Sequence, residues 1–181
     1  MNPAELLSRL NPSIPDINSL PSGWGGLSPS DIAASLAGLP RASQLILLAK
    51  WAQYPGLQHE LIYQLWNYAV DVSIQFGWPK PPAGQETYRK LAHLAIIEGV
   101  YPLPCRRCNG RKRTWRREGY SIICPRCSGA GTHTLSNRER CKIVGMSYYQ
   151  WRQLEYCYRV ISNAIQYWNN DGLRHVKNQL I

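Results

Sequence analysis

The chain has no long apolar run and no recognisable export signal. No uninterrupted apolar stretch approaches the roughly 20 residues that a membrane-spanning helix needs. The N-terminus lacks the basic and then apolar pattern of a secretory signal. We therefore expect a cytoplasmic protein with no membrane partner, in a compartment where thiols stay reduced and can bind metal.

Acidic side chains are too scarce in the second half to build a hydrolytic metal site. Residues 101–181 hold four Asp/Glu against fifteen Lys/Arg, and they contain no D-x-D or H-x-H pair. A zinc-ribbon nuclease would need such a cluster for metal-dependent hydrolysis. Residues 1–100 hold six Lys/Arg and seven Asp/Glu and no catalytic motif. We expect neither enzymatic activity nor a small-molecule substrate.

Four cysteines have the spacing of the ligands of one structural zinc ion. Cys105 and Cys108 form one C-x2-C pair, fifteen residues follow, and Cys124 and Cys127 form the second pair. This spacing falls within the zinc-ribbon range, and four thiolates complete the tetrahedron that Zn²⁺ prefers. The alternatives are two disulfides or a redox pair, but a redox pair does not require a second C-x2-C. We predict one structural Zn²⁺.

The positive charge of the chain is concentrated around these cysteines. The whole chain has a formal net charge of +10, and residues 1–100 contribute −1. A local concentration of positive charge is typical of nucleic-acid binding proteins. The planar guanidinium of arginine also suits phosphates and guanine edges. A solvated surface that only keeps the protein soluble is the alternative. The predicted nucleic-acid contacts in this module are Arg106, Arg107, Arg111, Lys112, Arg113, Arg116 and Arg117.

The remaining pattern predicts a mainly α-helical fold with an inserted zinc ribbon that has four cysteine ligands. We divide the chain into an irregular segment (1–29), a helical region (30–100), the zinc module (101–134) and a C-terminal helical part (135–181), with 30–181 forming one compact domain. Ser30 is predicted to cap the first helix. Between the cysteine pairs we expect a two-stranded ribbon, and we expect Cys141 and Cys157 to be core residues. Helices are predicted over 31–38, 42–53, 57–76, 86–98, 137–144 and 148–168.

The last two predicted helices have the pattern of a helix-turn-helix. Ser136 and Glu139 form a capping box at the first, and Gly145 provides the turn before the second. Trp151 and Leu154 are expected to pack the second helix onto the first. An αα-hairpin that only builds the core is the alternative. At the start of the second helix, the residues expected to face base edges are Tyr148, Tyr149, Arg152 and Gln153.

The cysteine module and the segment after it resemble a known family. The run from Cys105 to Gly131, followed by Cys141, Gly145 and Trp151, resembles the late-gene antitermination protein Q family of lambdoid phages, phage lambda type. The resemblance covers roughly residues 57–168, and residues before 57 have no match. C-x-x-C-x-G-x-G also occurs in DnaJ-type chaperones, but those carry four repeats and a J-domain that this chain lacks.

The resemblance implies a transcription antitermination factor in the host bacterial cytoplasm. Such proteins bind double-stranded DNA near a phage late promoter, engage host RNA polymerase with its sigma factor, and make it read through terminators. By this likeness the four cysteines hold zinc, and the arginines and the helix-turn-helix contact DNA. A helix-turn-helix repressor or activator is the alternative. Because proteins often use tryptophan as an interface anchor, we expect Trp24 and Trp78, in Gly/Pro-rich segments, to contact the protein partner.

Overall fold

The protein is mainly helical, with one small two-stranded sheet. The computed structural model describes residues 2–8, 29–54, 56–81, 83–116 and 119–180. In chain order the elements are α1 (Pro3–Ser8), α2 (Pro29–Ala34), α3 (Arg41–Lys50), α4 (Gln58–Gln75), α5 (Gln85–Gly99), β1 (Arg113–Trp115), β2 (Ser121–Ile123), α6 (Asn137–Val144) and α7 (Tyr148–Leu180).

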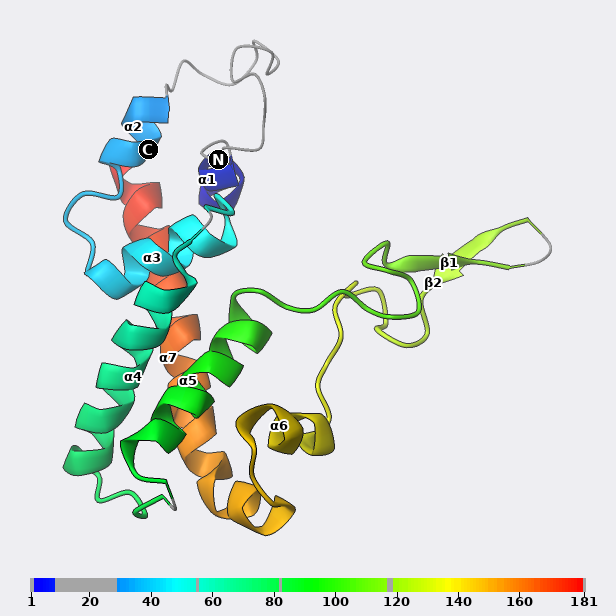
Figure 1. The fold of residues 1–181 in the computed structure, drawn as a ribbon. Helices are drawn as coiled ribbons and strands as arrows, with labels where there is room; N and C mark the ends of the chain where they lie inside the picture. Colours follow the sequence, from blue (N-terminus) through cyan, green and yellow to red (C-terminus); the bar gives the residue numbers. More distant parts are fainter. Residues whose placement is uncertain (1, 9–28, 55, 82, 117–118, 181) are drawn as a thin grey trace.

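The helices α3, α4, α5 and α6 gather around the long helix α7 (Figure 1). Apolar residues recur three or four positions apart along α4, so Leu61, Leu65, Ala69 and Val72 form one buried stripe. The main core continues from this stripe through the buried face of α5 to Trp151 on α7, which is fully buried. The helices predicted over residues 57–76 and 86–98 are confirmed to within a residue, although Phe76, expected in the buried stripe, is exposed.

Helix α7 is twelve residues longer than predicted. We expected it to end near Trp168, because an Asn-Asn-Asp-Gly run follows and glycine disfavours helix by about 1 kcal/mol. Instead the helix reaches Leu180. Tertiary contacts hold it in place: Asn169 accepts a hydrogen bond from Trp51 Nε1 at 2.9 Å, and Val176 is fully buried. Gly172 lies so close to Leu47 that a Cβ would come within 2.8 Å of its Cδ1.

The prediction of an irregular N-terminal segment is wrong for its first residues. Residues 3–8 form α1, and Leu7 is fully buried in a second apolar cluster with Leu36, Leu39 and Val176. Burial of this side chain against α7 compensates for the short length of the helix. The prediction that Ser30 precedes the first helix is also wrong, because α2 begins at Pro29. Residues 9–28 lie outside the described part of the chain.

The strands β1 and β2 form an antiparallel hairpin that extends away from the helices (Figure 1). Arg113 pairs with Ile123, Thr114 with Ile122, and Trp115 with Ser121. The predicted ribbon is therefore confirmed. The hairpin joins two cysteine turns, and Cys105, Cys108, Cys124 and Cys127 form a small cluster separate from the helical core.

Candidate metal centre and basic surface

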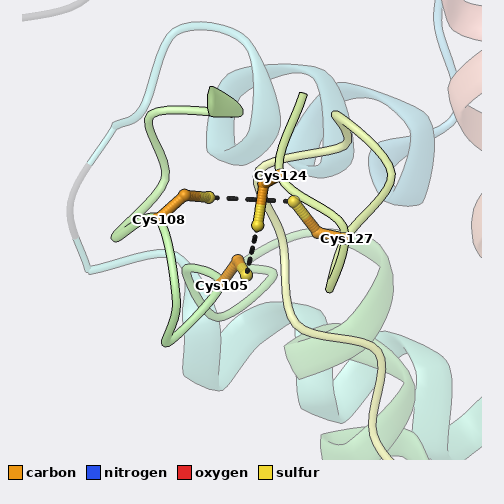
Figure 2. Close-up of side chains that lie close together, drawn as sticks. All are labelled: Cys105, Cys108, Cys124 and Cys127. Carbon is orange, nitrogen blue, oxygen red and sulfur yellow. Dashed lines mark hydrogen bonds between the residues drawn. The ribbon is translucent and has the colours of Figure 1, made fainter. Parts of the chain in front are cut away.

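The hairpin brings the two C-x2-C turns together. Cys105 and Cys108 precede β1, whereas Cys124 and Cys127 follow β2, and the Cys124 backbone N–H donates to the Lys112 carbonyl at 2.9 Å. The four sulfurs point toward one another (Figure 2) and all lie within 4.8 Å of one another. Among the described residues, this is the cluster of Cys, His, Asp or Glu side chains that can hold a metal ion.

The sulfur distances fit a tetrahedral metal site. Sγ of Cys105 lies 3.9 Å from Sγ of Cys124, and Sγ of Cys108 lies 3.7 Å from Sγ of Cys127. A tetrahedron with metal–sulfur bonds of about 2.3 Å has sulfurs about 3.8 Å apart. A disulfide would require about 2.05 Å, and all four cysteines are free thiols. The geometry therefore suits one ion bound by four sulfurs and excludes the disulfide alternative.

Backbone N–H groups favour the thiolate form of two cysteines in this cluster. The N–H of Cys108 is the main reason why the pKa of Cys105 falls to about 6. Burial opposes ionisation of Cys124, but the N–H groups of Cys127 and Arg126 lower its pKa overall. Burial, followed by hydrogen bonding to Cys127, raises the pKa of Cys108 to about 11. The opposed shifts show that the four sulfurs do not all ionise together on their own, and a divalent metal would supply the positive charge that four thiolates need.

A glycine is required where the second cysteine turn closes on the first. Gly131 donates its N–H to Cys127 Sγ at 3.3 Å and accepts at its carbonyl from the Cys105 N–H at 2.8 Å. Its φ is +80°, and a Cβ would lie 2.9 Å from the Gly110 carbonyl oxygen. Any side chain at this position would push the two turns apart and widen the sulfur cluster.

Glu139 connects the cysteine module to α6. Its carboxylate accepts a hydrogen bond from the Ser136 backbone N–H, in the capping box that the sequence predicts. This hydrogen bond is the main reason why the pKa of Glu139 falls to about 2. The same carboxylate lies 3.0 Å from His133 Nε2 and 3.7 Å from Arg106 Nη2, both of the module. His133 is therefore a linking residue and does not belong to the sulfur cluster.

The basic residues of the module lie at its surface. Arg113 donates from Nε to Ser121 Oγ at 2.9 Å and from Nη2 to the Ser121 carbonyl at 2.8 Å, so its guanidinium lies along the hairpin. Arg117 lies outside the described residues. The exposed predicted contacts are Arg106, Arg107, Arg111, Lys112, Arg113 and Arg116.

The start of α7 has an exposed and a buried side, as predicted. Trp151 and Leu154 are buried in the core. Gly145 ends α6 in the left-handed conformation, with φ of +67°, and turns the chain into α7. On the exposed side lie Tyr148, Tyr149, Arg152 and Gln153.

Trp78 does not have the exposed position on which its predicted partner contact depended. Its side chain is 8% exposed and makes an edge contact with Tyr88, with ring centroids 5.7 Å apart. The Pro-rich loop thus folds this ring back onto α5 instead of presenting it to solvent. Trp24 lies outside the described residues.

A polar network between three helices was not predicted from the sequence. Glu98 of α5 accepts from Arg140 of α6 at 2.9 and 3.0 Å, and it also accepts from the hydroxyl of Tyr158 on α7. The Arg140 guanidinium lies 5.5 Å from the centre of the Tyr158 ring. This network fixes α6 relative to α5 and α7. The three residues carry no common sequence motif that could have revealed it.

No protein-family model, curated protein or solved structure matches the chain. The likeness to the antitermination family therefore rests on the residues quoted above. No helix in the described part of the chain combines the length and apolarity needed to cross a membrane. Cys141 and Cys157 are buried on α6 and α7, apart from the sulfur cluster, as predicted.

Proposed function

We propose that the chain is a transcription antitermination factor of the lambdoid phage Q type, acting without catalysis. It binds double-stranded DNA near a phage late promoter and engages host RNA polymerase with its sigma factor, so that the polymerase reads through terminators. The observation that carries the proposal is the link through Glu139. It joins an arginine-rich, metal-competent module to α6, next to the exposed start of α7.

The metal in this proposal is one structural Zn²⁺. Four sulfur donors within 4.8 Å of one another favour Zn²⁺ over the hard, oxygen-seeking ions Mg²⁺ and Ca²⁺. With four protein ligands the ion has no free position for water or substrate, so its role is to hold the two cysteine turns together. Metal analysis of the purified protein should give one zinc per chain. Values near zero or two would contradict this assignment.

For DNA binding, we propose that α6 and the start of α7 act as a helix-turn-helix. The short α6, the left-handed Gly145 and the exposed Arg152 support this role. The module arginines would contact phosphates, which position a protein, while α7 would contact base edges, which specify the sequence.

These two DNA-binding roles predict different mutant phenotypes. Arg111→Ala should weaken binding to every duplex and reduce its salt dependence. Arg152→Ala should reduce discrimination by about 1–3 kcal/mol if it holds a bidentate base contact. Equal losses on cognate and random duplexes for both variants would show that the roles are not divided in this way.

The polymerase-binding surface in this proposal lies on the N-terminal half, which carries little net charge. Because Trp78 is buried, we propose instead that the anchors are the exposed apolar side chains of α4 and of the residue that follows it. Tyr63 is 55% exposed, Ile74 77% and Phe76 65%. Aromatic side chains such as those of Tyr63 and Phe76 are common anchors of protein interfaces.

A terminator read-through assay with purified RNA polymerase tests the function as a whole. On a phage late-promoter template the protein should increase read-through, and Cys124→Ser should abolish the increase. The alternative is a helix-turn-helix repressor or activator, which needs only the DNA-binding face. Such a protein would change initiation at the promoter and leave terminator efficiency unchanged.

A further inference from the structure

One face of the hairpin carries two exposed apolar side chains that the duplex-binding proposal does not use. Trp115 is 74% exposed and Ile123 is 60% exposed. Trp115 pairs across the hairpin with Ser121, and Ile123 pairs with Arg113, so all four side chains lie on one face. Figure 1 shows this hairpin extending well clear of the helices. A tryptophan left in water at this degree of exposure forgoes a large burial energy unless a partner covers it.

Positive charge surrounds this face. Arg113 lies on it, with its guanidinium held along the strands by two hydrogen bonds to Ser121. Arg116 follows Trp115 directly and is exposed. Between Cys105 and Cys127 the sequence contains eight basic residues and one acid. A partner of this face is therefore expected to be both polyanionic and able to cover a flat aromatic ring.

We propose that this face binds unpaired bases of single-stranded nucleic acid by stacking on Trp115. Base stacking on aromatic rings, combined with basic residues that contact the backbone, is the general mode of single-strand binding. In a duplex both faces of each base are already covered by neighbouring base pairs, so the indole ring could stack only by forcing them apart. The unpaired base is thus the partner that gains most from Trp115, while Arg113 and Arg116 contact its phosphates.

A protein partner fits this face less well. An interface anchored by Trp115 would have to neutralise the surrounding arginines with acidic side chains. A nucleic acid supplies one phosphate with every base. The proposal stands on the hairpin alone and does not require the antitermination role, so the two can fail separately.

The test measures binding of the full-length, zinc-loaded protein to labelled oligo(dT), oligo(U) and a short duplex by fluorescence anisotropy. Trp115→Ala should weaken binding to the single strands roughly 5- to 150-fold, as expected for the loss of one stacked base, and leave duplex binding unchanged. Trp115→Phe should retain most of the affinity because it keeps a flat ring, whereas Trp115→Leu should not. Tyr167→Ala, which removes an aromatic side chain 67% exposed on α7, is the matched control and should have no effect.

Oligo(dT) and oligo(U) separate the two sources of single strand. Tighter binding of oligo(U) assigns the face to a transcript, and tighter binding of oligo(dT) assigns it to a melted DNA strand. Zinc content and circular dichroism confirm that each variant folds. If Trp115→Ala loses zinc, the comparison of Trp115→Phe with Trp115→Leu decides the question.

Three results would overturn the proposal. One is equal binding of single strands by the Phe and Leu variants, and another is an equal loss on duplex and single strands. The third is unchanged single-strand binding by Trp115→Ala, and reduced capture of RNA polymerase by the same variant would then assign the face to a protein contact.

Discussion

Changing Glu98 to Gln should destabilise the protein by disconnecting α6 from α5 and α7. The carboxylate accepts hydrogen bonds from Nε and Nη2 of Arg140 and from the Tyr158 hydroxyl. In Glu98→Gln, one carboxylate oxygen becomes an NH₂ group, which places a donor against the donors of the guanidinium. Arg140 then loses the carboxylate it is paired with, and the charge of Glu155 compensates for that loss only in part.

The magnitude follows from the partial burial of the pair. Loss of one partner of a fully buried ion pair costs about 3–5 kcal/mol. Here the side chains of Arg140 and Glu98 are 23% and 16% exposed, and Arg140 keeps its contact with Asn137 Oδ1 at 3.1 Å. Water and these contacts compensate in part, so we expect a loss of about 2–3 kcal/mol in the free energy of unfolding, measured by urea denaturation.

A double-mutant cycle isolates the pair. In an Arg140→Met background, Glu98→Gln should cost no more than about 1 kcal/mol, because only the Tyr158 hydrogen bond is then altered. Glu86→Gln is the control: this carboxylate also pairs with an arginine, Arg89, but at an exposed site, so we expect no measurable change. If Glu98→Gln costs the same with and without Arg140, the reasoning is refuted.

Three further changes test the metal centre, the end of α7 and the capping box. Cys124→Ser should lose the metal and lower the melting temperature, while Cys157→Ser should keep the full metal content; retained metal in the first variant would contradict the ligand assignment. Gly172→Ala should destabilise the protein, because overpacking against Leu47 costs about 1–3 kcal/mol and exceeds a helix-propensity gain of about 1 kcal/mol. The same change should become stabilising in a Leu47→Ala background. If urea denaturation shows that Gly172→Ala changes the free energy of unfolding in the same direction in both backgrounds, the contact with Leu47 is not the cause. The Ser136 backbone N–H is the main cause that lowers the pKa of Glu139 from 4.5 to about 2. The contribution of the Glu139 carboxylate to stability is therefore fully present above pH 4.5 and is lost as the pH falls towards 2. The difference in stability between the wild type and Glu139→Gln should shrink over the same pH range.

Features set by neighbouring residues were predictable from the sequence. The ligand spacing of the cysteine module, the strand-forming residues between its two turns and the Ser136–Glu139 capping box all involve residues close together in the chain. Their geometry is set by local backbone preferences, and the spacing of the two cysteine pairs suits one tetrahedral metal ion. The apolar stripes of α4 and α5 were predictable for a similar reason, since a period of three to four residues defines one helix face.

The tertiary structure alone decided where α7 ends and where Trp78 lies. Local propensity around Gly172 opposes the helix by about 1 kcal/mol, but Trp51, Leu47 and the cluster around Val176 supply contacts from residues more than a hundred positions away. Composition likewise places Trp78 in an exposed loop, whereas packing against Tyr88 buries it.

The same limit applies to the Glu98 network. Its partners are 42 and 60 residues apart in the chain, and each of them is an ordinary surface residue type when read alone. Only the packing of α5, α6 and α7 brings a carboxylate, a guanidinium and a phenol to one place. The sequence by itself thus determined the chemistry of the cysteine module and the helical character of the rest. The final position of α6, the module linked to it and the start of α7 depended on long-range burial, because such contacts outweigh local preferences.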